Sequence, residues 1–154
     1  MAAQNLQGNR WLKVFPSDYC VIPYPTALSE GTTTSTSAGY LVDNTKNFLS
    51  DGIEIGMIVY NTTLESGATI ESVVNETTLK LNFDMMTSGQ TYKIYGSPAD
   101  QGAKLYVDVA TDIRIGNTNG DDEIFKALIG FVPLQCNKVF ETNTGTGASI
   151  IAIW

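Results

Sequence analysis

Histidine is absent from the 154 residues of the sequence. It is the side chain that most often serves as a general base or a metal ligand near neutral pH. Without it a Ser-His-Asp arrangement is excluded. The sequence also has no Gly-x-Ser-x-Gly elbow and no glycine-rich phosphate loop that opens a helix. We therefore expect a protein that is not an enzyme, with no catalytic residue, no metal and no cofactor.

Cysteine is almost as scarce, since the chain has two, Cys20 and Cys136, far apart in sequence. They form no CxxC pair, so neither a zinc site nor a thioredoxin-type motif is indicated. We interpret both as small buried apolar side chains. A disulfide between them is the alternative, and it requires that folding bring the two together.

Positive charge is also limited. Nine Lys and Arg residues stand against 16 Asp and Glu, which gives a net charge of −7, and charged residues make up 16% of the chain. Proteins that bind nucleic acid or anionic membranes carry a basic surface, so we expect neither partner. No apolar run approaches the roughly 20 residues needed to cross a bilayer. The first ten residues do not read as a signal peptide, so we expect a soluble protein that folds in a cytosol.

Short alternating runs dominate the rest of the sequence. Residues 79–83 (LKLNF) put three apolar side chains on one face, and residues 105–109 (LYVDV) do the same. Many short alternating strands with little helical periodicity predict an all-β sandwich or barrel-like fold. The other predicted strands cover residues 10–15, 20–24, 56–60, 68–74 and 92–95.

Turn signals separate these runs. Asn119-Gly120 predicts a type I′ hairpin, because both central positions of that turn need positive φ. Residues 45–49 and 121–128 are the two segments that suit a turn or two of helix, and the second is closer to a strand. The remaining predicted turns lie at Asp51-Gly52, Ser66-Gly67, Asn75-Glu76 and Ser88-Gly89.

Composition suggests that one domain interrupts another. Residues 29–38 (SEGTTTSTSA) read as a polar linker of low complexity, and residues 96–102 form a second break. We predict a host β-domain from residues 1–28 and 97–154, with a smaller β-module, residues 29–96, inserted into it. A single continuous sandwich is the alternative.

The sequence gives only weak signals for a ligand site. Residues 117–123 (NTNGDDE) gather oxygens as calcium loops do, but they lack the EF-hand spacing, so we interpret them as a solvated hairpin turn. No spacing singles out a catalytic carboxylate pair. The acidic residues considered for such a pair are Glu54, Glu65, Glu71 and Asp84.

Aromatic residues are the remaining feature. Trp11, Tyr19, Tyr24 and Trp154 suit either a core or an assembly surface, and sugars also stack on such rings. Residues 150–154 (IIAIW) form an apolar strand, which must be buried in its own sheet or against another subunit.

Two stretches resemble phage virion proteins. Residues 130–140 (GFVPLQCNKVF) and 142–154 (TNTGTGASIIAIW) resemble the C-terminal signature of a family of small virion proteins that includes the head-spike base proteins of phage-like gene transfer agents. Residues 105–115 resemble the strand pair that precedes it. A second widespread virion pattern is similar to the middle of the chain, at Phe48 and residues 41–43, 56–63, 68–70, 77–81 and 92–94.

The resemblance implies a capsid decoration (cement) protein or a vertex spike base on the outer surface of the phage head, made in the cytoplasm of the host bacterium. It implies a homotrimer that contacts the major capsid protein, with a spike or fibre protein as a further partner. Residues 1–28 and 129–154 would grip the capsid or the other subunits, and the insert would project outward. The interface residues expected on this basis are Trp11, Phe15, Tyr24, Phe131, Pro133, Ile151, Ile153 and Trp154.

Two alternatives stay open at this point. A tail or baseplate component would use the same β-folds. A carbohydrate-binding module would help the particle adhere to host surface glycans, with Tyr60, Tyr92 or Tyr95 as the stacking residue.

Overall fold

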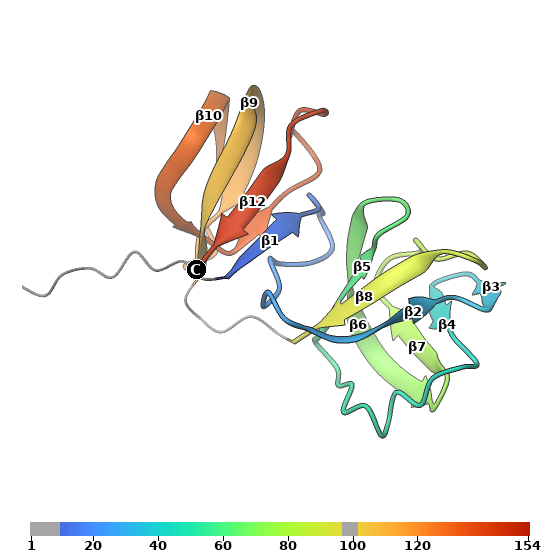
Figure 1. Ribbon diagram of the computed structural model, residues 1–154. Coiled ribbons are helices and arrows are strands. Elements are labelled where there is room, and N and C mark those ends of the chain that lie inside the picture. Colours follow the sequence, from blue (N-terminus) through green and yellow to red (C-terminus); the bar gives the residue numbers. More distant parts are fainter. Residues whose placement is uncertain (1–9, 97–101) are drawn as a thin grey trace, which may run out of the picture.

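The computed structural model describes residues 10–96 and 102–154 (Figure 1). They form twelve β-strands and no helix, arranged in two antiparallel sheets. The expected all-β class is therefore confirmed. The start of the chain, where a signal peptide was considered, and most of the predicted break at 96–102 lie outside the described residues.

A five-stranded sheet joins the two ends of the sequence. Its order is β1-β12-β9-β10, and β11 pairs with β9 beyond the end of β12. Both β9 and β10 are long, whereas the other three strands are short. The strands of this sheet are β1 (Trp11–Val14), β9 (Ala103–Gly116), β10 (Asp122–Cys136), β11 (Lys138–Val139) and β12 (Ile150–Ile153).

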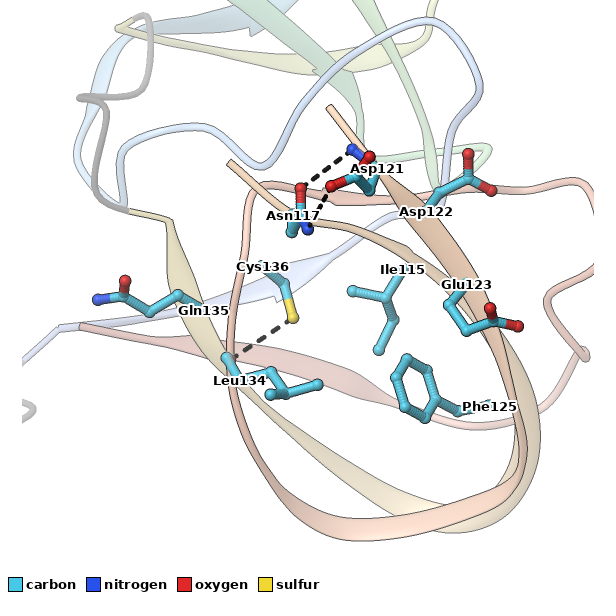
Figure 2. Close-up of a pocket in the computed structure, with 9 residues that line it drawn as sticks. All are labelled: Ile115, Asn117, Asp121, Asp122, Glu123, Phe125, Leu134, Gln135 and Cys136. Atoms are coloured by element: carbon cyan, nitrogen blue, oxygen red, sulfur yellow. Dashed lines mark hydrogen bonds between the residues drawn. The ribbon is translucent and has the colours of Figure 1, made fainter. Parts of the chain in front are cut away.

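The hairpin of β9 and β10 is bent back on itself. Cys136 is aligned with Ala103 at the start of β9, yet the next residue, Asn137, donates its N–H to the carbonyl of Gly116 at the end of β9, at 3.0 Å. Fourteen extended residues would span more than about 40 Å. The two ends of β9 therefore lie close together, and Figure 2 shows the curved ribbons that result.

Bulges in β10 produce the bend. The register against β9 shifts between Phe125 and Leu128, again before Gly130, and once more before Cys136. Ala127 and Gly130 have φ angles of 49° and 82°. An extra residue in one strand bends it and increases its twist, so these positions turn a flat ribbon into a small barrel-like layer.

The inner face of this sheet carries one apolar cluster. Leu105 and Val107 are fully buried, as their alternation predicts, but Val109 is 53% exposed. The expectation for Val109 is wrong because the pairing of β12 with β9 ends at Val107, just before the bend. The other buried members are Val14, Ile22, Ala103, Ile113, Ile115, Val132, Cys136, Val139, Ile150 and Ala152.

A seven-stranded sheet contains the middle of the chain. Its order is β2-β8-β5-β6-β7-β4-β3. Two residues, 33 and 34, separate β2 from β3, although these strands stand at opposite ends of the order. The sheet must therefore curl into a barrel-like shape. Its strands are β2 (Ala27–Thr32), β3 (Ser35–Ser37), β4 (Tyr40–Val42), β5 (Ile58–Asn61), β6 (Ser66–Asn75), β7 (Thr78–Leu81) and β8 (Thr91–Tyr95).

The barrel-like sheet encloses a second cluster. Leu79 and Leu81 are buried while Lys80 is exposed, as predicted. Phe83 lies beyond the end of β7, half-buried, and its ring stacks on Tyr19 with centroids 4.0 Å apart. The largest fully buried side chains of this cluster are Leu41, Phe48, Ile70, Leu79, Met86, Tyr92 and Ile94.

Three segment predictions are wrong. Residues 20–24 form no strand and belong to the connection between β1 and β2. Residues 29–38 are not a linker, because they form most of β2 and all of β3; Thr is a good strand former whatever the complexity of its surroundings. Ser66-Gly67 is not a turn but the start of β6. Gly67 is buried there, where a Cβ would lie 2.6 Å from the sulfur of Cys20.

The other local predictions have mixed outcomes. Residues 45–49 form turns and no helix, while residues 122–128 belong to strand β10. A hairpin does turn at Asn119-Gly120, but only Gly120 of that pair has positive φ, at 92°, so the type I′ assignment is wrong. The side chain of Asn117 shapes the loop instead by accepting the N–H groups of Asn119 and Asp121 at 2.9 and 3.0 Å.

A third apolar cluster lies where the two sheets meet. Phe15 and Tyr60 have ring centroids 4.8 Å apart, and Ser17 donates to the carbonyl of Gly67 at 2.6 Å. Leu12, Cys20, Ile58, Tyr95 and Trp154 complete the contact. Residues 27–95 thus form one sheet and residues 11–14 and 103–153 the other; their division into two domains stays a prediction.

Candidate functional site

One face of the five-stranded sheet is apolar and open. Opposite residues of paired antiparallel strands share a face. The register puts Trp11 beside Ile153, and Phe131 beside Tyr106, which in turn lies beside Ile151. We call these five side chains the apolar face.

Exposure distinguishes the two sides of the sheet. Trp11 is 67% exposed and Phe131 is 71% exposed, whereas their chain neighbours Leu12 and Val132 point inward and are buried. The rings of Phe131 and Tyr106 lie 5.1 Å apart between centroids. Exposed apolar patches on soluble proteins mark sites of interaction, so this face is the candidate functional site.

The outer face contains four of the residues predicted for an interface: Trp11, Phe131, Ile151 and Ile153. Pro133 is exposed two residues beyond Phe131 in β10. Tyr106 was missed, although its alternation with the buried Leu105 and Val107 is a signal that places it on the outer face.

Three other predicted interface residues lie elsewhere. Phe15 is 8% exposed and packs on Tyr60 in the core between the sheets, because β1 ends at Val14 and the chain turns inward. Tyr24 is 38% exposed in the connection between β1 and β2. Trp154 is half-buried against two apolar clusters. None of the three belongs to the apolar face.

Cations border the apolar face. Lys104 is exposed and aligned with Ile153, and Arg10 precedes Trp11. Among the residues that the structure describes, neither cation forms an ion pair. Lys13, in contrast, lies 2.5 Å from the carboxylate of Glu65. The end of the sheet where β1 and β9 begin therefore carries uncompensated positive charge near an exposed indole.

A pocket of about 230 Å³ lies inside the bend of the β9–β10 hairpin (Figure 2). The side chains of Ile115, Phe125 and Leu134 give it an apolar floor, and Cys136 and Gln135 complete one wall. The remaining lining residues come from the hairpin loop and the start of β10, and they form an acidic rim: Asn117, Asp121, Asp122 and Glu123.

The rim is only partly neutralised. Arg114 donates its Nε to Asp122 at 2.5 Å, and this hydrogen bond holds the pKa of Asp122 below its ordinary value. Asp121 and Glu123 have no cationic partner in the described part of the chain. The described residues contain no group of three or more Cys, Asp and Glu side chains able to hold a metal ion.

Three of the four carboxylates considered for catalysis have partners of their own, while Glu54 is exposed and forms no ion pair with the described residues. Glu65 pairs with Lys13, and Glu71 pairs with Lys80 at 2.9 Å. Asp84 accepts the N–H of Gly39 at 2.8 Å. These contacts link strands and turns, which is a structural role for Glu65, Glu71 and Asp84.

The cysteines and the tyrosines proposed for glycans are buried. Cys20 and Cys136 are free, and burial raises the pKa of each thiol to about 11. Tyr60, Tyr92 and Tyr95 are at most 5% exposed. Their rings pack in the cores and cannot stack on a sugar, which corrects that part of the carbohydrate-binding hypothesis.

Comparison of the chain with protein-family models, with curated proteins and with solved structures finds no match. Among the described residues there is no helix with the length and apolar character needed to cross a membrane. The site must therefore be interpreted from its own geometry.

Proposed function

We propose that this protein is a non-enzymatic structural component of a tailed-phage particle. It sits on the outer surface of the head as a capsid decoration protein or as the base of a vertex spike. The phage assignment rests on the resemblance of residues 130–140 and 142–154. The observation that supports a cohesive role is the apolar face, with Trp11 67% and Phe131 71% exposed. A protein of low charge that presents such a surface is suited to permanent contact with neighbours.

Cohesion is the mechanism under this proposal. Burial of the apolar face supplies most of the free energy, at about 25 cal/mol per Å². Uncharged polar side chains would add neutral hydrogen bonds across the subunit contacts. A standard interface buries about 1,600 Å² in total, and repetition around a closed ring multiplies modest contacts into a stable assembly.

The partners proposed are further copies of the same chain, in a trimer, and the major capsid protein. The five-stranded sheet would make these contacts, because it contains the apolar face. The seven-stranded sheet would project outward, where a spike or fibre protein can contact it.

Electron microscopy of purified particles tests the proposal. Gold-labelled antibodies against the chain are expected to bind at the head surface, and deletion of its gene is expected to remove density there. Label on the tail or baseplate would favour the alternative position. The absence of the chain from purified particles would contradict a virion role altogether.

A further inference from the structure

We propose that the Trp11 edge of one copy docks into the pocket of a second copy. This inference rests on the proposed function, since it specifies how the chains of the assembly meet. The indole of Trp11 packs on the apolar floor of the pocket. The two cations beside it, Arg10 and Lys104, then face the acidic rim of the second copy.

Charge complementarity is the first reason. The described part of the chain contains two uncompensated cations at the end of the five-stranded sheet where β1 and β9 begin, Arg10 and Lys104. It also contains two carboxylates without cationic partners, Asp121 and Glu123, on the rim of its pocket. Opposed patches of this kind fix the register between two proteins and speed their encounter.

Shape and polarity are the second reason. A tryptophan that is exposed in the free protein and enters a pocket of its partner on binding often contributes a large share of the binding free energy. The pocket has a floor of Ile115, Phe125 and Leu134 and a polar rim on one side. The Trp11 surface matches this arrangement, because it has an apolar indole with positive charge beside it.

Symmetry is the third reason. Trp11 lies on β1, which is the first strand in the order of the five-stranded sheet. The pocket lies within the β9–β10 hairpin, and β10 is the last strand in that order. An interface between two different patches is heterologous, and heterologous contacts form a closed ring when the rotation from one copy to the next closes. A trimer built this way uses each patch once per chain.

Charge reversal in the full chain tests the contact. Lys104→Glu and Glu123→Lys are each expected to weaken self-association by about tenfold or more, as measured by sedimentation at a series of concentrations. The double variant K104E/E123K restores opposite charges and is expected to regain most of the lost affinity. Matched controls are Lys80→Glu in β7 and Glu76→Lys in the turn between β6 and β7. They change the net charge equally and are expected to leave association unchanged.

Each contrary result has a separate meaning. A wild-type oligomer that tolerates both single reversals, or a double variant that regains nothing, would overturn this contact while leaving the virion proposal intact. A wild-type chain that stays monomeric would overturn the contact as well. If E123K blocks incorporation into particles without changing the oligomeric mass, the pocket holds another virion protein and not a second copy. Failure of the virion role itself appears in the particle labelling.

Discussion

The rings of Tyr106 and Phe131 lie 5.1 Å apart on the outside of the five-stranded sheet, joined by the register of β9 and β10. Aromatic pairs at this separation attract each other, but here one of the two rings is 71% exposed. A monomer gains little from that arrangement. An assembly that covers both rings gains the full apolar area.

Phe131→Ser is expected to separate assembly from stability. The free energy of unfolding of the monomer should change by less than about 1.5 kcal/mol, since the lost contact is one exposed ring pair. Self-association should weaken at the same time. Chemical denaturation and sedimentation of the same sample measure the two effects.

Leu105→Ala on the buried side of the same sheet is the contrasting variant. Leu105 is fully buried, so its truncation should lower the free energy of unfolding by about 2–5 kcal/mol. If F131S proves as destabilising as L105A, the outer face contributes to the monomer's own stability and the assembly account loses its basis.

Tyr92→Phe tests a buried polar contact in the barrel-like sheet. The hydroxyl of Tyr92 donates to Asp43 at 2.7 Å, and both residues are buried. Loss of a hydrogen bond to a charged group should cost about 2 kcal/mol. Tyr95→Phe is the control, since its hydroxyl has no hydrogen bond to any residue within 10–96 or 102–154, and a smaller loss is expected. Equal effects of the two changes on unfolding by urea would contradict the assignment.

Stability should fall in acid. Burial raises the pKa of Asp43, but hydrogen bonds from Thr45 and Tyr92 outweigh it, so the pKa lies below the ordinary 3.8. Hydrogen bonds from Lys126 and Arg114 likewise lower the pKa of Asp112 and Asp122. A carboxylate with a lowered folded pKa stabilises the fold above its unfolded pKa, and this stability is lost as pH falls through the folded pKa.

The measurement is thermal unfolding at a series of pH values below about 5. The wild type should lose stability as the pH drops below the ordinary carboxylate range. Asp43→Asn should be less stable than the wild type near neutral pH and should show a shallower acid decline. An unchanged slope in this variant would mean that Asp43 is not coupled to folding.

Gly67→Ala tests the packing between the two sheets. A Cβ at Gly67 would meet Cys20 at 2.6 Å and the ring of Tyr60 at 3.0 Å. Overpacking of this kind costs about 1–3 kcal/mol. Gly96→Ala is the control because its nearest neighbour would lie 3.9 Å away, at Leu28. Equal unfolding temperatures for the two variants would show that the sheets do not pack closely at this point.

The sequence predicted the fold class and much of the apolar face because strand alternation is local. In β9, residues 105 and 107 point inward, so residues 104 and 106 point outward. In β12, residues 150 and 152 point inward, so residues 151 and 153 point outward. Once the strands are paired, the outward residues of neighbouring strands together form the apolar face.

What the sequence did not predict depends on contacts between distant residues. The bend of β10 arises from register shifts against β9, and the pocket exists only because of that bend. Gly67 looked like a turn residue, but its small size serves the close approach of Cys20, from a segment almost 50 positions earlier. Low complexity at residues 29–38 suggested a linker, although pairing with β8 and β4 makes strands of this segment.

The central claim is that the apolar face is buried between subunits, and the native mass of the purified full chain tests it most directly. The account predicts an oligomer, expected at three times the 16.7 kDa of one chain, that dissociates when Trp11 and Phe131 are both changed to Ser. A wild-type chain that remains at 16.7 kDa at every concentration measured would contradict it.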